Sequence, residues 1–388
     1  MINKYGSWVV GNKIFYVSYD AYRFASETNH QVNFHYHPTV WNNFDRSLLG
    51  KNSLPSLYKD RAQQLRDKYD YLILYYSGGA DSHNILRTFI DNNIKLDEVC
   101  VKWPKPLMDG KFYTPNTTDV SANNYWSEWD YCVKPNLDWL KNNKPEIKIT
   151  IKDFIGDPDK FDVDGMFEEI DSNSFHAGLL LNSKVSDSER PLIESGKTVA
   201  NIYGANKPLL RLNGNLIEMF FTDNALLTSV KSRINPYGAE NFYWAFDMPL
   251  LPFEMAYQTA MHYKLNINDR KFLVLPKKDR KLDTLSVGIQ TEAQGIISKG
   301  IIYRHTWDNR FQSTKPGSQA RLDKFSWFFE QNELSRTKDI FLDNVNQRLA
   351  LINDRYILTE DYHGTTIKSL VGATSHGYAV TTLGDTLV

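Results

Sequence analysis

A short segment that begins at Ser77 has the sequence SGGADS and gathers several groups that bind phosphate. The adjacent glycines Gly78 and Gly79 let the backbone turn sharply and bring its N–H groups close to a polyanion. Ser77 and Ser82 can add hydroxyl donors, and the Asp81 carboxylate can hold the Mg²⁺ that accompanies a nucleotide. These residue types at this spacing predict a site for a phosphate chain.

The segments on either side have the composition needed to position this loop. Residues 71–76 are apolar without alternation, as expected for a parallel strand that is covered on both faces. Residues 82–92 read as a helix, and the free amides and dipole of a helix N-terminus favour negative charge. A strand, a glycine turn and a helix N-terminus form the structural context of a phosphate-binding motif.

The pattern S-G-G-x-D-S resembles the pyrophosphate-binding loop of the N-type ATP pyrophosphatases, the PP-loop family. The resemblance implies an adenine nucleotide alpha-hydrolase-like fold and cleavage of ATP between its α- and β-phosphates, with AMP and pyrophosphate as products. It implies ATP and Mg²⁺ as the ligands of the loop. By position, Ser77, Gly78, Gly79, Asp81 and Ser82 would contact the nucleotide, and Asp81 would also hold the metal.

Within that family, the chain is similar to the synthetase domain of asparagine synthetase, with two departures. The family shows an acidic segment after its fourth strand, whereas residues 204–207 have the sequence GANK. Glutamine-dependent members begin with a glutaminase domain whose nucleophilic cysteine follows the initiator methionine, whereas Ile2 stands here. The resemblance therefore leaves the acid substrate open, and ammonia or an amine would supply the nitrogen. PP-loop proteins of this kind also occur in bacteriophages, and the resemblance extends to that group.

Strands alternate with helices through the middle of the chain. Predicted strands at residues 98–103, 148–152 and 198–203 follow the first one, and predicted helices at 82–92 and 122–142 lie between them. This alternation predicts an α/β fold with a doubly wound parallel sheet, whose ligands bind at the carboxyl ends of the strands.

The sequence divides into three regions around this sheet. Residues 1–65 are expected to form a short β-rich segment with a hairpin and loops, and residues 66–265 the PP-loop ATP-binding domain. Residues 266–388 form an irregular α/β region that would complete the substrate site or a partner interface. We also expect a hairpin closed by Asn213 and Gly214, helices at 252–264 and 325–330, and a strand-poor tail or partner-binding arm at 364–388.

A lysine after the predicted strand at residues 198–203 supplies a second candidate site. A residue at the carboxyl end of such a strand faces the ligand crevice, where the Lys207 ammonium could neutralise charge on the α-phosphate. Arg211 is expected behind it as a second catalytic cation. We expect the adenine near the end of the second strand, around Lys102 and Trp103. The alternative for Lys207 is a solvated lysine in a turn.

A rival nucleotide motif fails on its spacing. Residues 195–198 have the sequence SGKT, which matches the end of a Walker A loop. The first glycine of that motif would fall on Pro191, and a predicted strand follows where a helix is required. Lys197 is therefore not expected to bind phosphate.

Histidines and cysteines offer two further constellations. His30, His35 and His37 have a spacing that would suit half a metal site on a strand, or paired histidines at a surface or interface. Cys100 and Cys132 could serve a sulfur-transfer enzyme, but their apolar neighbours favour buried structural thiols.

Basic residues are unevenly distributed, although the formal net charge is −1. They gather in residues 264–324, first between 264 and 281 and again from 299 onward. Most such clusters are solvated faces, but this one could also contact ATP phosphates or a nucleic acid. A small-molecule substrate is the first expectation, and a nucleic acid bound through residues 264–324 is the alternative.

The bulk composition, 41% hydrophobic and 23% charged over 388 residues, is ordinary for a globular protein. No apolar stretch approaches the roughly 20 residues that span a bilayer, and the N-terminus lacks the apolar core of a signal peptide. Two cysteines without a C-x-x-C spacing favour a reducing cytoplasm.

These observations predict an ATP-dependent, AMP-forming C–N ligase. ATP would adenylate a carboxylate or amide oxygen, and ammonia or an amine would then displace AMP in an asparagine-synthetase-like amidation. Two alternatives stay open: a PP-loop enzyme that thiolates or amidates a nucleic-acid base, and an ATP-binding protein without turnover. The sequence predicts no particular oligomeric state.

Overall fold

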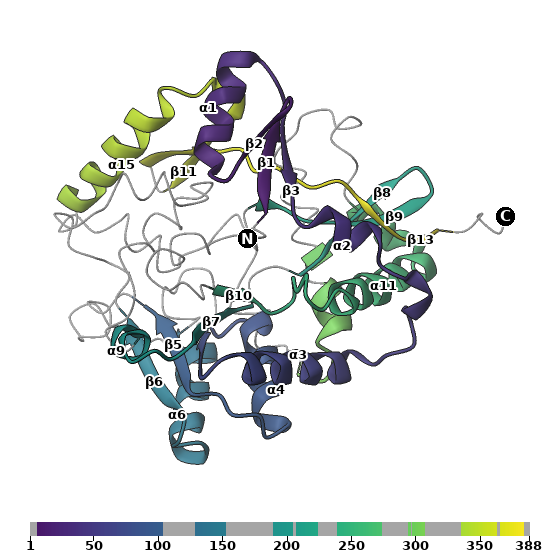
Figure 1. Ribbon diagram of the computed structural model, residues 1–388, viewed down its shortest axis with the longest axis vertical. Helices are drawn as coiled ribbons and strands as arrows, with labels where there is room; N and C mark the ends of the chain where they lie inside the picture. Colours follow the sequence, from purple (N-terminus) through teal and green to yellow (C-terminus); the bar gives the residue numbers. More distant parts are fainter. Residues whose placement is uncertain are drawn as a thin grey trace.

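The computed structural model has an α/β fold built around a parallel five-stranded sheet (Figure 1). The predicted helix at residues 325–330, part of the predicted helix at 122–142 and the basic residues from 277 to 281 lie outside the described residues. The structure describes residues 6–103, 129–152, 189–204, 207–223, 239–273, 294–295, 297–306, 335–362 and 365–383.

The central sheet confirms the predicted parallel strands. It consists of β4 (Tyr71–Tyr75), β5 (Glu98–Lys102), β6 (Lys148–Lys152), β7 (Val199–Tyr203) and β10 (Ala239–Asn241). All neighbouring pairs are parallel, and the order across the sheet is β10-β7-β4-β5-β6. Strands β4, β5 and β7 are largely buried and mainly apolar, which is why the sequence predicts them well. The short strand β10 has no such run, and the sequence does not predict it.

Helices lie on both faces of this sheet, which is compatible with the predicted doubly wound arrangement. α3 (Leu54–Lys68), α4 (Ala80–Asp91) and α6 (Lys134–Asn143) contribute apolar side chains to the main core on one face. On the other face, Leu192 and Ile193 of α9 (Glu189–Glu194) pack against a smaller cluster that includes Ile73 and Tyr75.

The N-terminal region forms a separate antiparallel sheet, ordered β2-β1-β3, from β1 (Ser7–Val10), β2 (Lys13–Phe15) and β3 (Val32–His35). The pairing of β1 with β2 confirms the predicted hairpin. α1 (Ser18–Thr28) packs on this sheet, and the short helices α2 (Pro38–Asn42) and η1 (Arg46–Leu48) lead toward α3. Part of the expected loop region is instead helix α3, whose start is marked by the Ser53 cap and a proline in the first turn.

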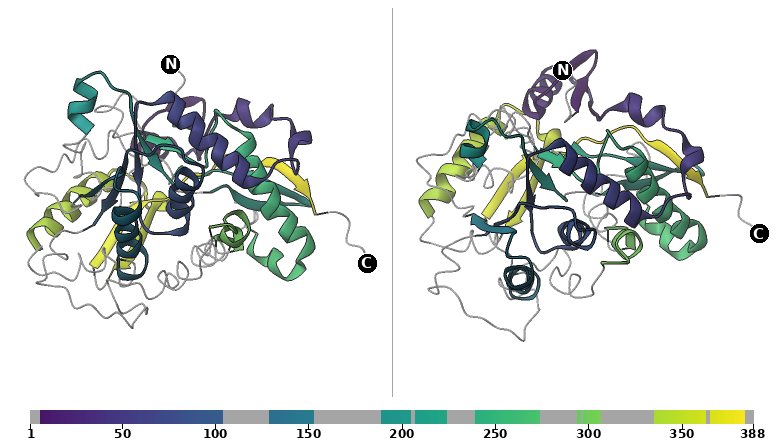
Figure 2. Two further views of the ribbon diagram at one scale, coloured as in Figure 1. Left: turned by 90° about the horizontal axis from the view of Figure 1, so that it is seen from below. Right: turned by 60° about the horizontal axis from the view of Figure 1, so that its bottom comes forward.

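A third sheet contradicts the expectation of a strand-poor C-terminal tail. β8 (Leu209–Asn213) and β9 (Leu216–Phe220) form the predicted hairpin, with Gly214 at φ 61° in its turn. β13 (Tyr378–Thr382) pairs with β9, and β12 (Thr365–Leu370) pairs with β11 (Ile357–Tyr362). The threonines of β12 and β13 explain the difference, because threonine has a high strand propensity even in a segment that is also rich in Gly and Ser. In both views of Figure 2, the yellow strand β13 lies beside the green helix α11.

The remaining helices complete the fold. α11 (Leu250–Leu265) confirms the helix predicted at residues 252–264, and residues 297–302 are also helical. One apolar core runs from Trp8 to Val380, and α3 crosses residue 65, so the three predicted regions pack together. Within the described ranges, no helix has the length and apolar character to cross a membrane. The other helical segments are η2 (Trp129–Val133, a π-helix), η5 (Ile267–Phe272), α15 (Ser335–Leu349) and η8 (Asp354–Tyr356).

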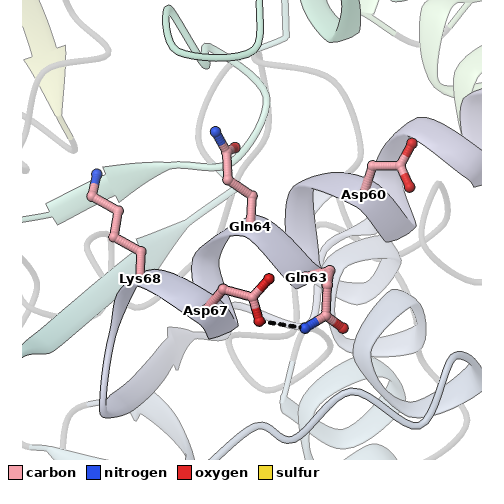
Figure 3. Close-up of a pocket in the computed structure, with 5 residues that line it drawn as sticks. All are labelled: Asp60, Gln63, Gln64, Asp67 and Lys68. Carbon is pink, nitrogen blue, oxygen red and sulfur yellow. Dashed lines mark hydrogen bonds between the residues drawn. The ribbon is translucent and has the colours of Figure 1, made fainter.

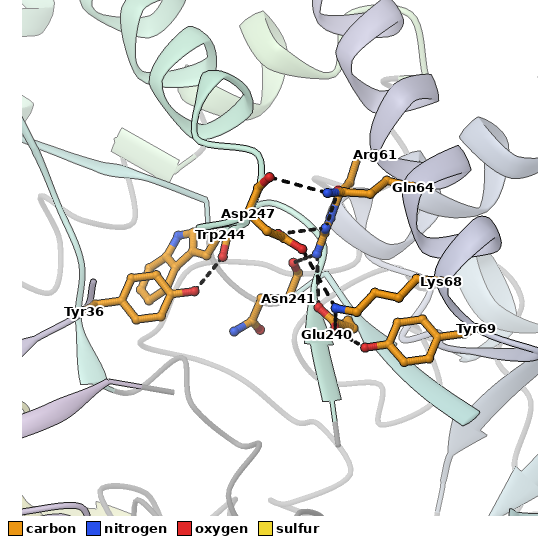
Figure 4. A network of polar contacts seen from close by, with 9 residues as sticks. All are labelled: Tyr36, Arg61, Gln64, Lys68, Tyr69, Glu240, Asn241, Trp244 and Asp247. Atoms are coloured by element: carbon orange, nitrogen blue, oxygen red, sulfur yellow. Dashed lines mark hydrogen bonds and ion pairs between the residues drawn. The ribbon is translucent and has the colours of Figure 1, made fainter. Parts of the chain in front are cut away.

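A buried polar network joins α3 to β10 at the edge of the sheet (Figure 4). The Arg61 guanidinium, 1% exposed, contacts the carboxylates of Glu240 and Asp247 at 3.2 and 3.0 Å. It also donates to the Asn241 carbonyl at 3.2 Å and to the Gln64 side chain at 2.6 Å. Because a buried charge is tolerated only when it is paired, this network fixes the position of α3 against the sheet.

Replacing Arg61 by lysine tests this anchoring role. Lysine keeps the charge but cannot reproduce the forked donors of a guanidinium, so buried acceptors would lose a partner. We expect Arg61→Lys to lower the free energy of unfolding by about 2 kcal/mol, measured by chemical denaturation. Arg87→Lys is the control, because Arg87 is partly exposed, where it pairs with Asp91 and lies 5.5 Å from the centre of the Trp139 ring, and this variant should change by less than about 0.5 kcal/mol. Equal losses in both variants would contradict the role of Arg61.

Candidate active site

The glycine loop lies where the order of the sheet reverses. Counted along the chain from β4, the strands follow the order 3-2-1-4-5 from β6 to β10. In open α/β sheets, ligands bind at the carboxyl ends of the strands beside such a switch point, here between β4 and β7. Ser77 follows the end of β4, and Lys207 follows the adjacent end of β7. The two predicted sites therefore belong to one crevice.

The backbone of the loop requires its glycines. Gly78 has φ 76°, in the left-handed region, and a Cβ at this position would lie 2.8 Å from Val133 Cγ2. Gly79 is the N-cap residue of α4, and no side chain in the described structure caps that end of the helix. The first amides of α4 are therefore left to bind an anion.

Two serines hold the loop in this conformation. The Ser82 hydroxyl accepts from the Ser77 N–H at 3.2 Å and donates to the Gly79 carbonyl at 3.1 Å. The Ser77 hydroxyl lies 3.3 Å from Ser82 Oγ and accepts from the Gly79 N–H at 3.3 Å. Because Ser82 is 4% exposed, it shapes the loop from inside, whereas the exposed Ser77 is placed to contact a ligand.

The Asp81 carboxylate brings the loop and the predicted lysine together. Lys207 Nζ lies 3.3 Å from Asp81 Oδ1. A second ammonium, Lys299 Nζ, lies 3.7 Å from Asp81 Oδ2. The lysine side chains are 12% and 26% exposed, so both are largely buried. These three side chains, called the charge cluster below, carry a net positive charge beside a loop that is shaped for phosphate.

Buried tyrosines fix the position of Asp81. The Tyr303 hydroxyl donates to Asp81 Oδ1 at 2.8 Å, and the Tyr243 hydroxyl donates to the Asp81 carbonyl at 2.7 Å. Burial, reinforced by the Asp81 charge, raises the pKa of both tyrosines well above their ordinary range, so both remain donors. Burial alone would raise the pKa of Asp81, but Lys207, Lys299 and Tyr303 outweigh it and lower that pKa. The carboxylate is therefore ionised at neutral pH.

The end of β7 touches the first turn of α4. A Cβ on Gly204 would lie 3.1 Å from both Asp81 C and Ser82 N, which are backbone atoms. Such a close approach suits a residue without a side chain. Gly204 and Lys207 therefore both lie beside the N-terminal turn of α4, on the same side of the crevice as Asp81.

Sequence reasoning missed Lys299, Tyr303 and Tyr243 as site residues. Tyr243 and Tyr303 are 162 and 222 residues away from Asp81 along the chain. No local motif marks them, because their role comes from tertiary packing. The one sequence signal was the basic character of residues 264–324, for which contact with ATP phosphates was one of the expectations.

The structure does not bring Arg211 to the loop. Its Nε donates to Glu218 Oε2 at 2.8 Å, and its Nη1 donates to the Ser375 carbonyl at 3.4 Å. These contacts hold the Arg211 guanidinium against the antiparallel sheet of β8, β9 and β13. Because side chains alternate along β8, the inward position belongs to the buried Leu210, and Arg211 lies on the other face. The expectation that Arg211 stands behind Lys207 as a catalytic residue is not supported.

The two residues predicted near the adenine differ in their exposure. Trp103 is 1% exposed and packs against Trp129, with 5.2 Å between the ring centres. It packs as a core residue, and this burial does not support the prediction that its side chain binds adenine. Lys102 is partly exposed at the end of β5, and its ammonium lies 5.1 Å from the centre of the Tyr75 ring. Lys102 therefore stays at the edge of the crevice.

The Walker-like segment lies at the opposite end of the sheet. Gly196, with φ 82°, and Lys197 connect α9 to the amino end of β7. Thr198 donates through its backbone N–H and its hydroxyl to the Asp70 carboxylate, just before β4 begins. This end of a parallel sheet is not where phosphates bind, which agrees with the exclusion of a Walker loop.

The predicted histidine constellation does not assemble a metal centre. Within the described residues, no group of three or more His, Cys, Asp or Glu side chains is placed to hold a metal ion. The His35 ring lies 5.8 Å from the His376 ring, and the His37 ring stacks on Phe246 at 3.9 Å. These histidines take part in packing between β3 and the segments beside it.

A shallow hollow on α3 offers no alternative active site (Figure 3). Its lining comes from one helix face, where the Gln63 amide donates to the Asp67 carboxylate at 2.7 Å. A single helix supplies no facing walls to enclose a ligand. The lining residues are Asp60, Gln63, Gln64, Asp67 and Lys68.

Comparisons of the chain with protein-family models, with curated proteins and with solved structures gave no match. The function is therefore inferred from the site itself. Three features meet there: the glycine loop, the N-terminus of α4 and the charge cluster of Asp81, Lys207 and Lys299.

Proposed function

We propose that the protein is an ATP-dependent ligase that forms AMP and pyrophosphate, on an adenine nucleotide alpha-hydrolase-like fold. The observation that carries the proposal is the contact of Asp81 with Lys207 at the switch point of the sheet, beside the glycine loop. The strand order and the parallel sheet support the proposed fold.

Each group has a separate task in binding ATP. The backbone amides of Gly78 and Gly79 and the N-terminus of α4 would hold the pyrophosphate portion. Lys207 would stabilise negative charge that develops on the α-phosphate, and Lys299 would stabilise the leaving pyrophosphate. Both ammonium groups are already held at Asp81, so the site is organised before the substrate binds.

Asp81 fits the binding of Mg²⁺. This ion prefers oxygen ligands and usually binds through one or two carboxylates together with substrate phosphates. Asp81 offers an ionised carboxylate in the first turn after the loop. When bound, the ion would supply shielding of the phosphate charges.

The proposed reaction has two steps. An oxygen of the substrate carboxylate or amide attacks the α-phosphorus, the α–β phosphoanhydride bond breaks, and pyrophosphate leaves. Ammonia or an amine then attacks the activated carbon, the bond between that carbon and the AMP oxygen breaks, and an amide or related C–N bond forms. The nitrogen gives its proton to solvent. Positioning and charge neutralisation are the contributions of the protein.

Product analysis tests the proposal directly. With Mg²⁺, ATP and a suitable acid substrate, we expect AMP and pyrophosphate in equal amounts, because the loop would hold the β- and γ-phosphates as the leaving group. Labelled pyrophosphate should exchange into ATP when the acid substrate is present without an amine. Formation of ADP and phosphate would show that the bond to the γ-phosphate is broken, and the proposal would be wrong.

A nucleic-acid-modifying enzyme of the PP-loop class is the alternative hypothesis. In the described part of residues 264–324, Lys299 belongs to the charge cluster, and Arg270 donates to two backbone carbonyls at the end of α11. Cys100 and Cys132 are buried, which disfavours sulfur transfer through either thiol. These contacts favour a small-molecule substrate. Salt-sensitive tRNA binding would support the alternative, and ATP binding without pyrophosphate release would indicate a protein without turnover.

A further inference from the structure

An asparagine in the middle of β7 is buried without a hydrogen-bond partner. Asn201 is 0% exposed, and neither its Nδ2 nor its Oδ1 has a partner within the structure described here. Burying an amide without compensating hydrogen bonds is unfavourable, and such groups are rare in native folds. The position of Asn201 next to the switch point suggests what would satisfy it.

The register of the sheet shows which face Asn201 occupies. Val199 and Tyr203, two residues before and after it, belong to the apolar cluster that contains Ile73 and Tyr75. Because side chains alternate along a strand, Asn201 lies on the same face, opposite the face covered by α4. Tyr203 is the last residue of β7, so Asn201 lies just inside the carboxyl end of the strand.

A second amide, which has one unsatisfied oxygen, lies on the neighbouring strand. β10 pairs with β7 so that Ala239 is opposite Asn201 and Asn241 is opposite Tyr203. Asn241 therefore shares this face, and Figure 4 shows its amide directed away from Arg61. It is 7% exposed, and its Oδ1 has no partner among the residues described. Strand spacing puts the Cα atoms of the two asparagines on the order of 8 Å apart. Asn201 has Ala239 of β10 beside it on one side and Ile73 of β4 on the other.

We propose that Asn201 and Asn241 bind the second substrate through an amide edge, meaning an N–H donor next to a C=O acceptor. The unsatisfied atoms carry no charge, so they fit a neutral polar group. The Asn201 amide offers both a donor and an acceptor and can pair with such an edge through two hydrogen bonds, as asparagine does with adenine. Asn241 adds a further acceptor.

This inference rests on the proposed function, because it places the substrate beside the ATP site. The glycine loop and Lys207 follow the ends of β4 and β7, whereas the two asparagines lie on β7 and β10. ATP and a molecule held by the asparagines would therefore lie side by side. Amide edges occur in amino-acid carboxamides and in nucleobases, and these two sources can be distinguished by experiment.

Calorimetric titration of the full chain without ATP tests the inference. The probes are L-asparagine and L-glutamine for the amino-acid source, and uridine and guanosine for the nucleobase source. We expect one of these pairs to bind, and Asn201→Leu to weaken that binding by roughly ten- to a hundredfold, because two hydrogen bonds are lost while the shape is kept. Thr150→Val, on the same face but on the distant strand β6, is the control and should leave binding unchanged.

Several outcomes separate this inference from its alternatives. If none of the four probes binds, or if Asn201→Leu binds them as tightly as the unmodified chain, the inference is overturned. Should Asn201→Leu not fold, Asn241→Leu replaces it and should weaken binding by about fivefold. Binding of α,β-methylene-ATP is measured separately. If that analogue fails to bind while a probe binds in an Asn201-dependent way, the proposed function is wrong and the amide site stands.

Discussion

Replacing Asp81 by asparagine is expected to abolish Mg²⁺-dependent turnover of ATP, with a loss of about 10³ or more in rate. The variant keeps the size of the side chain and an oxygen that accepts from Tyr303, but it removes the charge that would hold the metal. It also leaves Lys207 and Lys299 without the carboxylate between them, so ATP binding without Mg²⁺ should become severalfold tighter. Pyrophosphate release and ATP titrations with and without Mg²⁺ measure both effects.

The opposite signs of these two effects make the test specific. A residue with a purely structural role would weaken binding under both conditions and lower the thermal stability together with the activity. Asp138→Asn is the control, because Asp138 is an exposed residue of α6 that pairs only with Lys134 among the described side chains. If metal-free ATP binding were weaker in Asp81→Asn than in the unmodified chain, the assignment of Asp81 to the metal would be contradicted.

Replacing Lys207 by alanine is expected to lower kcat by about 10²–10³ and to raise the KM for ATP much less. The reason is that charge on the α-phosphate grows in the transition state, so a positioned ammonium contributes more there than in the ground state. Lys207→Arg should recover only part of the rate, because a planar guanidinium cannot occupy the place of a compact ammonium. Steady-state kinetics of pyrophosphate release measure these changes.

Lys197 provides the control for this experiment. It lies at the amino end of β7, at the opposite end of the sheet from Lys207, so Lys197→Ala should leave kcat and KM unchanged. A damaging Lys197→Ala together with a silent Lys207→Ala would mean that the crevice lies at the other end of the sheet.

The parts of the site that could be predicted from the sequence are those with local causes. The loop is a run of adjacent residues, and its residue types indicate its backbone conformation. For example, the positive φ of 76° at Gly78 is one that glycine adopts readily. Strand β4 is a continuous apolar run, β5 and β7 are mainly apolar, and their parallel pairing places Lys207 beside the loop. Topology predicts that Lys207 lies near the loop, and the structure adds its contact with Asp81.

The parts that could not be predicted depend on burial and on distant contacts. Trp103 and Lys102 are neighbours in sequence, but only packing against Trp129 makes one a core residue. Arg211 lies within β8, whereas Lys207 precedes that strand. The alternation of side chains along β8 directs the Arg211 side chain toward Glu218. The same residue types in a turn would have been free to face the crevice.

The separation of the charge cluster along the chain has a consequence for how the protein is made. Lys207 is 126 residues beyond Asp81, and Tyr303 is 222 residues beyond it. β4 can pair first with β5, its nearer neighbour along the chain, whereas contacts across such separations form late because long loops must first be closed. On a ribosome, the loop would emerge well before its cations and its tyrosine are synthesised. Tight nucleotide binding would then be a property that the chain acquires only after Tyr303 has been synthesised.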